Sequence, residues 1–201
     1  MKTPIVMKIV MEGQISDMES IKKAHPKDEI RFERKDNGKT ITARCVKRDG
    51  DKLYFVTDIV DRLPMRTRAE RCTWRDCHVR AVITQLAEKV LPDELLSIVI
   101  PRTIKQYIGG EEIITEDKFW IPSSTEVGEK AACDPDDEAV FESIENERDR
   151  IMVDEDGETW WYWLRSAYSA NNFRYVSNNG NLYNYNASYT HGVVLGFCID
   201  L

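Results

Sequence analysis

The last 42 residues of the chain decide its fold: Trp160–Leu201, WWYWLRSAYSANNFRYVSNNGNLYNYNASYTHGVVLGFCIDL. The stretch opens with three of the five tryptophans of the protein and closes on the apolar run Val193–Ile199. Between these anchors, residues 168–191 contain seven Asn, five Tyr and three Ser, with no Lys, Asp or Glu and a single Arg, Arg174. Because the whole chain has nine Asn, this bias is a local property that bears on function.

Binding surfaces favour these residue types, since Tyr offers a large contact area at low entropic cost and Ser and Asn form short, adaptable hydrogen bonds. The alternative interpretation is a low-complexity polar loop. Order is favoured because Asn178-Asn179-Gly180 predicts a hairpin with a two-residue type I′ turn. Apolar residues such as Phe173, Val176 and Leu182 also recur through the segment. We therefore expect an ordered, exposed recognition surface.

Many residues of this segment belong to the set Asn, Tyr, Ser, His and Thr, which is reached from an Asn codon by changing adenines only. The pattern resembles the variable region of target proteins of diversity-generating retroelements, where adenine-directed mutagenesis scatters such residues over a ligand-binding face. The resemblance implies a hypervariable region and assigns ligand contacts to Tyr168, Asn171, Asn172, Tyr175, Ser177, Asn178, Asn179, Asn181, Tyr183, Asn184, Tyr185, Asn186, Ser188, Tyr189 and His191.

Two further motifs resemble an uncharacterised domain family of gut bacteria and their phages. Tyr162-Trp163-Leu164-Arg165-Ser166 matches its YWLRS motif, and Gly192–Ile199 matches its C-terminal G-V-x-x-G-F-C-I. Both groups are similar to the C-type-lectin-like fold, which formylglycine-generating-enzyme domains share. The resemblance implies an α+β, C-type-lectin-like fold with antiparallel sheets, two helices and long loops. It spans residues 28–201, which predicts a ligand-binding domain there and an N-terminal arm at residues 1–27.

The composition restricts the partners. A net charge of −7 argues against nucleic acid or an anionic membrane, because phosphate binding needs a basic face. No apolar run approaches the roughly 20 residues that a membrane span requires, so membrane insertion is not expected. The first 14 residues lack a secretory signal pattern, which predicts synthesis in the cytoplasm and, with the retroelement resemblance, a virion-associated (phage tail) protein.

Catalytic and metal sites are not predicted. Cys72, Cys77 and His78 are the only grouped soft ligands, and no second pair completes a zinc site. The acidic run from Glu129 to Glu158 is typical of a solvated loop, and a calcium-binding site is the alternative interpretation of its carboxylates. The resemblance to formylglycine-generating enzymes raises a metal-dependent oxidase as a rival function. Those enzymes use a closely spaced cysteine pair, however, and this chain has only Cys198 near its C-terminus. We expect no enzyme and no cofactor.

Periodicity predicts the remaining elements. Alternation over 28–59 predicts about three strands, and an apolar stripe predicts a helix over 73–91, followed by a short helix at 92–97. Strands are expected at 4–12, 98–104 and 117–121, and short helices at 17–24, after Ser123 and over 139–150.

The combined prediction is a receptor-recognition protein that binds a protein or glycan on a target surface, with a structural virion or surface subunit as the plainer alternative. The rigid anchors would be Tyr175, Tyr183, Tyr185 and Tyr189, and Arg165 would form a structural hydrogen-bonded pair behind them. Homo-oligomerisation is left open.

Overall fold

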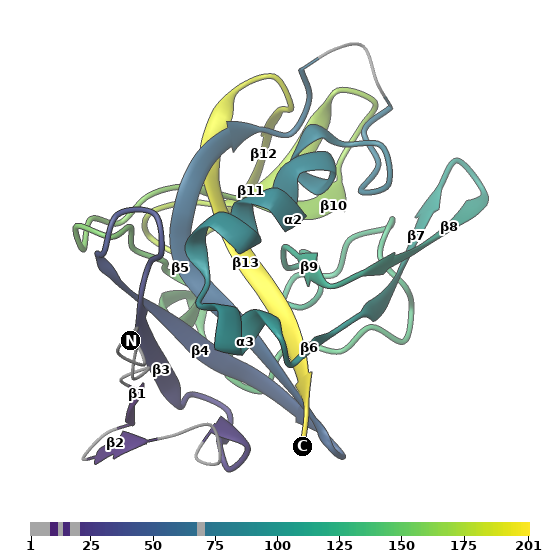
Figure 1. Ribbon diagram of the computed structural model, residues 1–201. Coiled ribbons are helices and arrows are strands. Elements are labelled where there is room, and N and C mark those ends of the chain that lie inside the picture. The colour runs from purple at the N-terminus through teal and green to yellow at the C-terminus, as the bar shows by residue number, and fades with distance from the viewer. Residues whose placement is uncertain (1–8, 12–13, 17–20, 68–70) are drawn as a thin grey trace.

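The computed structural model describes residues 9–11, 14–16, 21–67 and 71–201 (Figure 1). Within these residues the main element is a nine-stranded sheet, accompanied by two helices and two small two-stranded sheets. In the main sheet the path runs β12 (Leu182–Asn186), β11 (Asn172–Val176), β10 (Tyr162–Ala167), β13 (Thr190–Asp200), β5 (Lys52–Pro64), β4 (Thr40–Asp49) and β3 (Glu29–Glu33). The short strands β6 (Val99–Ile100) and β9 (Phe119–Trp120) also pair with β13. The fold class is therefore α+β and rich in sheet, as the sequence predicts at that level.

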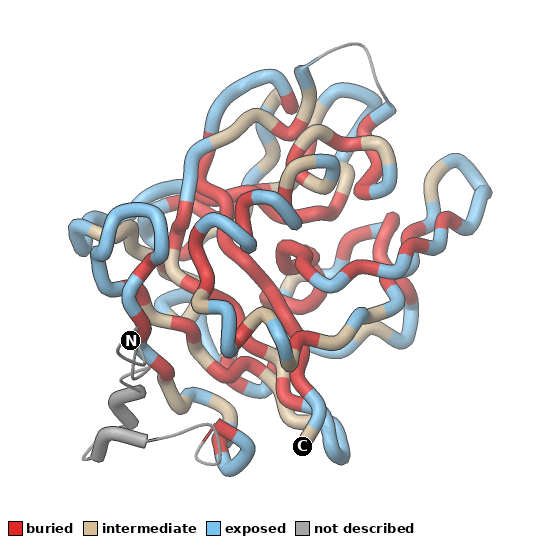
Figure 2. Tube along the Cα trace, in the orientation of Figure 1, coloured by how far each residue is buried: buried red, intermediate tan, exposed pale blue. Residues whose placement is uncertain are grey.

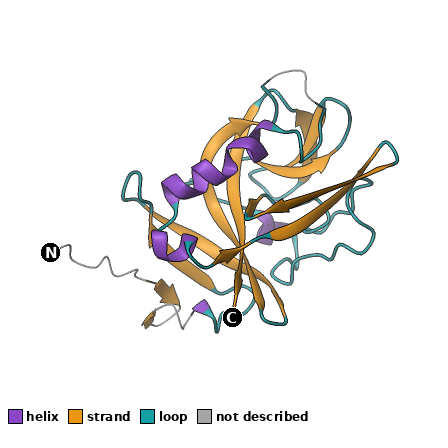
Figure 3. Ribbon diagram, turned by 45° about the vertical axis from the view of Figure 1, so that its right-hand side comes forward, coloured by secondary structure: helices purple, strands orange, loops and turns teal. Residues whose placement is uncertain are grey.

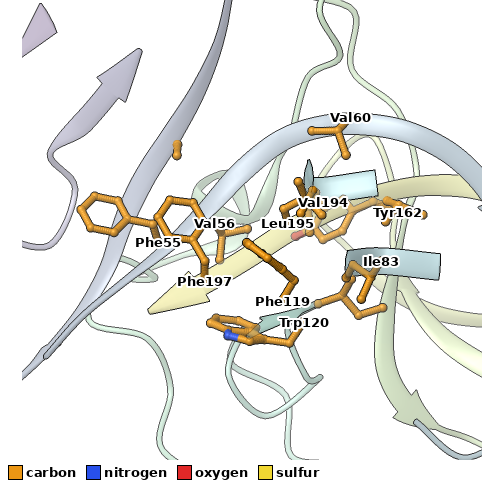
Figure 4. Packing of buried hydrophobic residues seen from close by; sticks show 14 of the residues in the cluster. Phe55, Val56, Val60, Ile83, Phe119, Trp120, Tyr162, Val194, Leu195 and Phe197 are labelled. Carbon is orange, nitrogen blue, oxygen red and sulfur yellow. The ribbon is translucent and has the colours of Figure 1, made fainter. Parts of the chain in front are cut away.

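The antiparallel pair β13 and β5 forms the long centre of this sheet, with Thr190 opposite Pro64 at one end and Asp200 opposite Lys52 at the other. Residues 191–199 of β13 are all buried, which explains their continuous apolar run, because a strand covered on both faces has no solvent side. Figure 2 shows this buried stretch crossing the middle of the molecule. The core is held by contacts such as the stacked rings of Phe55 and Phe197, whose centroids lie 5.4 Å apart (Figure 4).

Gly196 is required where β9 crosses β13. A Cβ atom at this position would overlap the indole ring of Trp120. Glycine in a strand often marks such a close approach. The absence of a side chain at Gly196 lets the fully buried Trp120 lie flat against the central strand.

Helices α2 (His78–Val90) and α3 (Asp93–Leu96) lie over β5 and β13 on one side of the sheet (Figures 1 and 3). The predicted start of the first helix at residue 73 is wrong, because residues 73–76 form a bend and a turn. The backbone N–H of Trp74 donates to Gln106 Oε1, and its indole N–H donates to Asp117. These bonds tie the turn to a neighbouring hairpin, and the helix begins only after Cys77, whose Sγ accepts from Arg80 N–H.

That hairpin consists of β7 (Arg102–Ile108) and β8 (Glu111–Asp117), which project from the body of the molecule (Figure 3). Its two strands are joined by a turn at Gly109-Gly110, where both glycines have positive φ. The strand expected over 98–104 is divided between β6 and β7, the strand expected over 117–121 contains β9, and β8 was not predicted.

The region from residue 123 to residue 150 contains less helix than predicted. Ser123 and Glu126 form the reciprocal bonds of a capping box, but they close turns and not a helix. The helix expected over residues 139–150 is wrong, since only the 3-10 turn η1 (Glu147–Arg150) forms there. The carboxylates of this region accept hydrogen bonds from distant segments, which fixes irregular backbone in place of a regular helix.

At the N-terminal end, β1 (Ile9–Met11) pairs with β2 (Gln14–Ser16). Strand β1 lies within the strand expected over 4–12, and β2 follows it. The first half of the helix expected over 17–24, residues 17–20, lies outside the described residues, and the division at residue 27 stays a prediction. No described helix has the length and apolar character needed to cross a membrane.

Candidate functional site

The Asn/Tyr/Ser-rich segment folds into the hairpin β11–β12 at one end of the main sheet, with Asn172 opposite Asn186 and Val176 opposite Leu182. The hairpin prediction is confirmed, but the two-residue type I′ turn is wrong. The connection spans residues 177–181, and only Gly180 has positive φ. A Cβ atom on Gly180 would overlap the carbonyl of Glu147, so the turn is also packed against η1.

Strand alternation divides the segment into two sides. Tyr183 pairs with Tyr175 and Tyr185 pairs with Phe173, so these four rings lie on one side of the hairpin. Asn184 and its partner Arg174 lie on the other, as do Asn172 and Asn186. The prediction of one combined Asn/Tyr face is therefore wrong, because successive side chains of a strand point to opposite sides.

The tyrosine side belongs to a larger aromatic cluster, made of Trp161, Trp163, Tyr175, Tyr183, Tyr185, Tyr189 and His191. Trp163 lies 4.2 Å from His191 between ring centroids, and Tyr175 lies 5.1 Å from it. Tyr185 links His191 to the outer ring of Tyr189, at 5.5 and 4.8 Å. These separations are those of favourable tilted and edge-to-face ring pairs.

Burial is graded across the aromatic cluster. Trp163, Tyr175 and His191 form its buried floor. The other four rings are substantially exposed: Trp161 by 39%, Tyr185 by 37%, Tyr183 by 50% and Tyr189 by 55%. Large rings that pack on a rigid floor and still face solvent form a preorganised apolar surface, and such surfaces mark interaction sites more often than scattered exposed residues do.

Three residues predicted to contact ligand are buried, and these assignments are corrected. Tyr175 lies under Tyr183 and Trp161. Ser177 is used inside the turn, where its hydroxyl bonds to Asn179 and to the carbonyl of Asn181. His191 lies in the middle of the cluster floor.

The state of His191 follows from its surroundings. Nδ1 lies 2.7 Å from the carbonyl oxygen of Thr190, and Nε2 has no hydrogen-bond partner among the described residues. Burial lowers the pKa of His191, because the charged imidazolium loses hydration there. A neutral ring that donates from Nδ1 to Thr190 satisfies this arrangement.

The remaining predicted residues are distributed over both sides and the two ends of the hairpin. Asn172 donates to Asn184 Oδ1 at 2.8 Å on the polar side, where Arg174 also pairs with Glu129 and lies over the ring of Tyr168. The exposed residues are Tyr168, Asn171, Asn178, Asn179, Tyr183, Tyr185, Ser188 and Tyr189, and the half-buried ones are Asn172, Asn181, Asn184 and Asn186.

Trp161 belongs to the exposed part of the cluster, although the sequence analysis treated it only as an anchor of the segment. It contacts Tyr175 and His191, and its indole N–H lies 3.4 Å from Asn178 Oδ1. The signal was present in the sequence: Trp161 and Trp163 are two residues apart, so an extended chain puts both on the same side.

Behind the cluster, Arg165 is buried in an ion network. Its guanidinium donates to the Ile121 carbonyl, to Glu126 and to Glu138. Burial alone would raise the pKa of Glu126, but Arg102 and Arg165 lower it to about 2. Burial raises the pKa of Glu138, which has fewer compensating charges. The predicted structural role of Arg165 is confirmed.

The other candidate sites take structural roles where they are described. Burial raises the pKa of Cys77 to about 12, and its sulfur caps α2. Cys198 is also buried, and burial raises its pKa. In the acidic run, Asp134 accepts from Ser166 and Thr125. No group of three or more potential metal ligands occurs within the described part of the chain.

A cavity of about 220 Å³ lies beside the ion network, away from the aromatic cluster. Its lining includes Arg102, Lys47 and Lys105 together with Glu126 and Glu138. Because both cations and carboxylates line it, the cavity favours no single ligand charge.

Comparison with known proteins assigns the chain to a family. It belongs to the family named domain of unknown function DUF6273, whose model matches residues 49–201. The matched part includes the aromatic cluster, both helices and the ion network. No curated protein matches the chain, and no solved structure matches it.

Proposed function

We propose that this protein is a ligand-binding protein whose contact surface is the exposed part of the aromatic cluster. The observation that carries the proposal is the graded burial of that cluster: Trp161, Tyr183, Tyr185 and Tyr189 face solvent on a floor of buried rings. Buried rings stabilise the fold because their apolar area is removed from water, whereas the exposed rings contribute little to this stability. Their exposure on a fixed support is therefore best explained by a partner that covers them.

The physical chemistry of the surface suits recognition. Aromatic side chains dominate binding hot spots, because they bury a large area and lose little conformational freedom. The ring contacts within the cluster hold Tyr183 and Tyr185 before a ligand arrives, which limits the ordering cost of association. Residues 175–191 contain no Asp, Glu, Lys or Arg, so binding would not require a charge to be desolvated.

The proposal includes the finer expectations from the sequence. The scaffold would be C-type-lectin-like, the segment 168–191 would be diversified by a retroelement, and the partner would be a protein or glycan recognised by a phage tail or surface-display protein. The residue bias and the two C-terminal motifs support this part. Sequencing the neighbouring DNA tests it. A reverse-transcriptase gene and a near-copy of the 3′ coding segment that differs at adenines are expected, and their absence would remove the diversification claim.

The contact surface is tested with a double variant, Tyr183→Ala with Tyr189→Ala. The probes are a glycan array and intact cells of the species whose genome encodes the chain. We expect at least one probe to bind the wild type and the double variant to lose about 10-fold or more in affinity, since two hot-spot rings are removed. The matched control is Tyr107→Ala, which removes an exposed tyrosine on the distant β7–β8 hairpin. Unchanged binding by the double variant, or equal loss in the control, would contradict the assignment.

A further inference from the structure

The two edges of the main sheet differ in how they are protected. At one edge, β3 carries Glu29, Arg31 and Glu33 among its five residues, and β1 lies beside it (Figure 1). At the other edge, β12 has the sequence Leu-Tyr-Asn-Tyr-Asn, with no charge, proline or bulge, and pairs only with β11 in the described part of the chain. Proteins normally protect sheet edges with such features, because an open edge pairs with another strand.

The backbone of β12 presents free groups on its outer side. Two backbone hydrogen bonds, from Ser177 N–H to the Asn181 carbonyl and from Ala187 N–H to the Asn171 carbonyl, show that the odd-numbered residues form the hydrogen-bonded pairs of this ladder. The even-numbered residues of β12 therefore direct N–H and C=O away from β11. Among the described residues, nothing bonds to the backbone of Leu182 or Asn184 on this side, and Asn186 keeps a free N–H.

We propose that a second copy of the chain covers this edge by antiparallel pairing of β12 with β12, around a two-fold axis at Asn184. In this register the two Asn184 residues exchange both backbone hydrogen bonds. Each Asn186 N–H donates to the Leu182 carbonyl of the second copy. This pairing satisfies both backbone groups of Asn184, the carbonyl of Leu182 and the N–H of Asn186, and the two main sheets become one continuous sheet.

The sequence of β12 fits a second copy because it reads nearly the same from both ends. Around the central Asn184, Tyr183 lies opposite Tyr185 of the second copy, and Leu182 lies opposite Asn186 of the second copy. Directly opposed aromatic residues stabilise antiparallel pairs, and no like charges meet. An isologous contact requires this kind of self-complementarity.

The pairing also joins the two aromatic clusters. Tyr183 and Tyr185 point to the same side of the strand, so the rings of both copies form one band across the axis. If the proposed function holds, each dimer presents a doubled contact surface. The dimer itself rests on the open edge alone, and its test requires no ligand.

The first measurement is the mass of the purified full chain by light scattering. Because self-association depends on protomer concentration, samples should extend to about 100 µM. The expected mass is twice 23.3 kDa. Asn184→Lys places two like charges opposite each other at the axis and should give a monomer, whereas Asn178→Lys, in the adjacent turn, should stay dimeric. A wild type that remains at 23.3 kDa throughout would overturn the proposal.

A second measurement identifies the edge directly. Opposed residues of antiparallel strands have Cα atoms about 5.5 Å apart, a separation that a disulfide can span. Mild oxidation of Asn184→Cys should therefore give a covalent dimer on a non-reducing gel, and Asn178→Cys should not. The five native cysteines are all buried and provide a low background. A dimer that Asn184→Cys fails to cross-link, or that Asn184→Lys leaves intact, would place the interface elsewhere and overturn the β12 assignment.

Discussion

Strand β10 separates two regions that reverse the usual distribution of polar and apolar side chains. Trp163 belongs to the buried floor of the aromatic cluster, and four other large rings of that cluster are exposed to solvent. Two residues later, Arg165 pairs with Glu126 in an ion network, and the side chain of Glu126 is almost completely buried. Buried charges and exposed apolar patches are the informative exceptions to ordinary burial. Here each buried charge has an opposite charge beside it, which stabilises one geometry, but the exposed rings still have an uncovered side.

The largest effect should come from breaking the ion network. Arg165→Met keeps much of the side-chain volume but removes one of the two cations that Glu126 and Glu138 share, since Arg102 also pairs with both. Removing one member of a buried ion pair costs about 3–5 kcal/mol, because the remaining charge stays desolvated. Urea unfolding should show a loss of this size in the free energy of unfolding.

The matched control for that variant is Arg174→Met on the polar side of the hairpin. Arg174 pairs with Glu129, whose side chain is 44% exposed, and such pairs contribute less than about 1 kcal/mol. Equal losses in the two variants would show that the network behind β10 has no special role in stability.

The floor of the aromatic cluster should give the next largest effect. Tyr175→Ala removes a buried ring that contacts Trp161, Tyr183 and His191, and we expect a loss of about 3 kcal/mol, as for other large-to-small core substitutions. Tyr175→Phe keeps the ring, so its loss should be well below that of the alanine variant in the same urea measurement. If both variants unfold at wild-type urea concentrations, Tyr175 is not part of the floor.

The local parts of this architecture were predictable. Alternation in residues 28–59 gave β3, β4 and part of β5, because adjacent antiparallel strands depend on short-range pattern and turns. The helix expected over 139–150 failed because its carboxylates bond to distant segments, for example Glu142 to the backbone of Arg48. Such long-range partners cannot be seen in a single sequence.

The site was predictable to the same extent. The Tyr-Asn-Tyr-Asn alternation of residues 183–186 contains the division into two sides, and a period-two analysis of that stretch would have found it. The burial of Tyr175 and His191 was not predictable, because it depends on the hairpin packing against the start of β13. Their ring contacts join positions 16 residues apart through tertiary structure alone.

The titration of His191 in the floor of the aromatic cluster should have a smaller effect on stability than the substitutions of Arg165 and Tyr175. Burial lowers the folded-state pKa of His191, so the unfolded chain binds a proton that the folded chain resists. Stability should therefore be full above the unfolded pKa of about 6.5 and should fall as pH drops toward the folded pKa. One such proton contributes a slope of at most about 1.4 kcal/mol per pH unit.

His191→Phe tests this assignment, because it keeps a ring in the cluster floor and removes the titrating group. Urea unfolding at pH 7.5 and pH 5.5 should show a smaller difference for the variant than for the wild type. Asp58, whose pKa burial raises to about 6, has an effect of the opposite sign, so the same pH dependence in both proteins would contradict the assignment to His191.

The smallest stability effect is expected at the exposed rim of the cluster. Tyr183→Ala should change the free energy of unfolding by less than about 0.5 kcal/mol, since half of the side chain already faces solvent and surface substitutions rarely cost more. Paired with Tyr175→Ala in one urea series, it measures the gradient from floor to rim across neighbouring residues of one hairpin. A steep gradient means that Tyr183 can be replaced without loss of the fold, so any loss of binding in its variants reports contact with ligand. A loss at Tyr183 comparable to that at Tyr175 would make the exposed ring part of the folding core and would remove the distinction between the two.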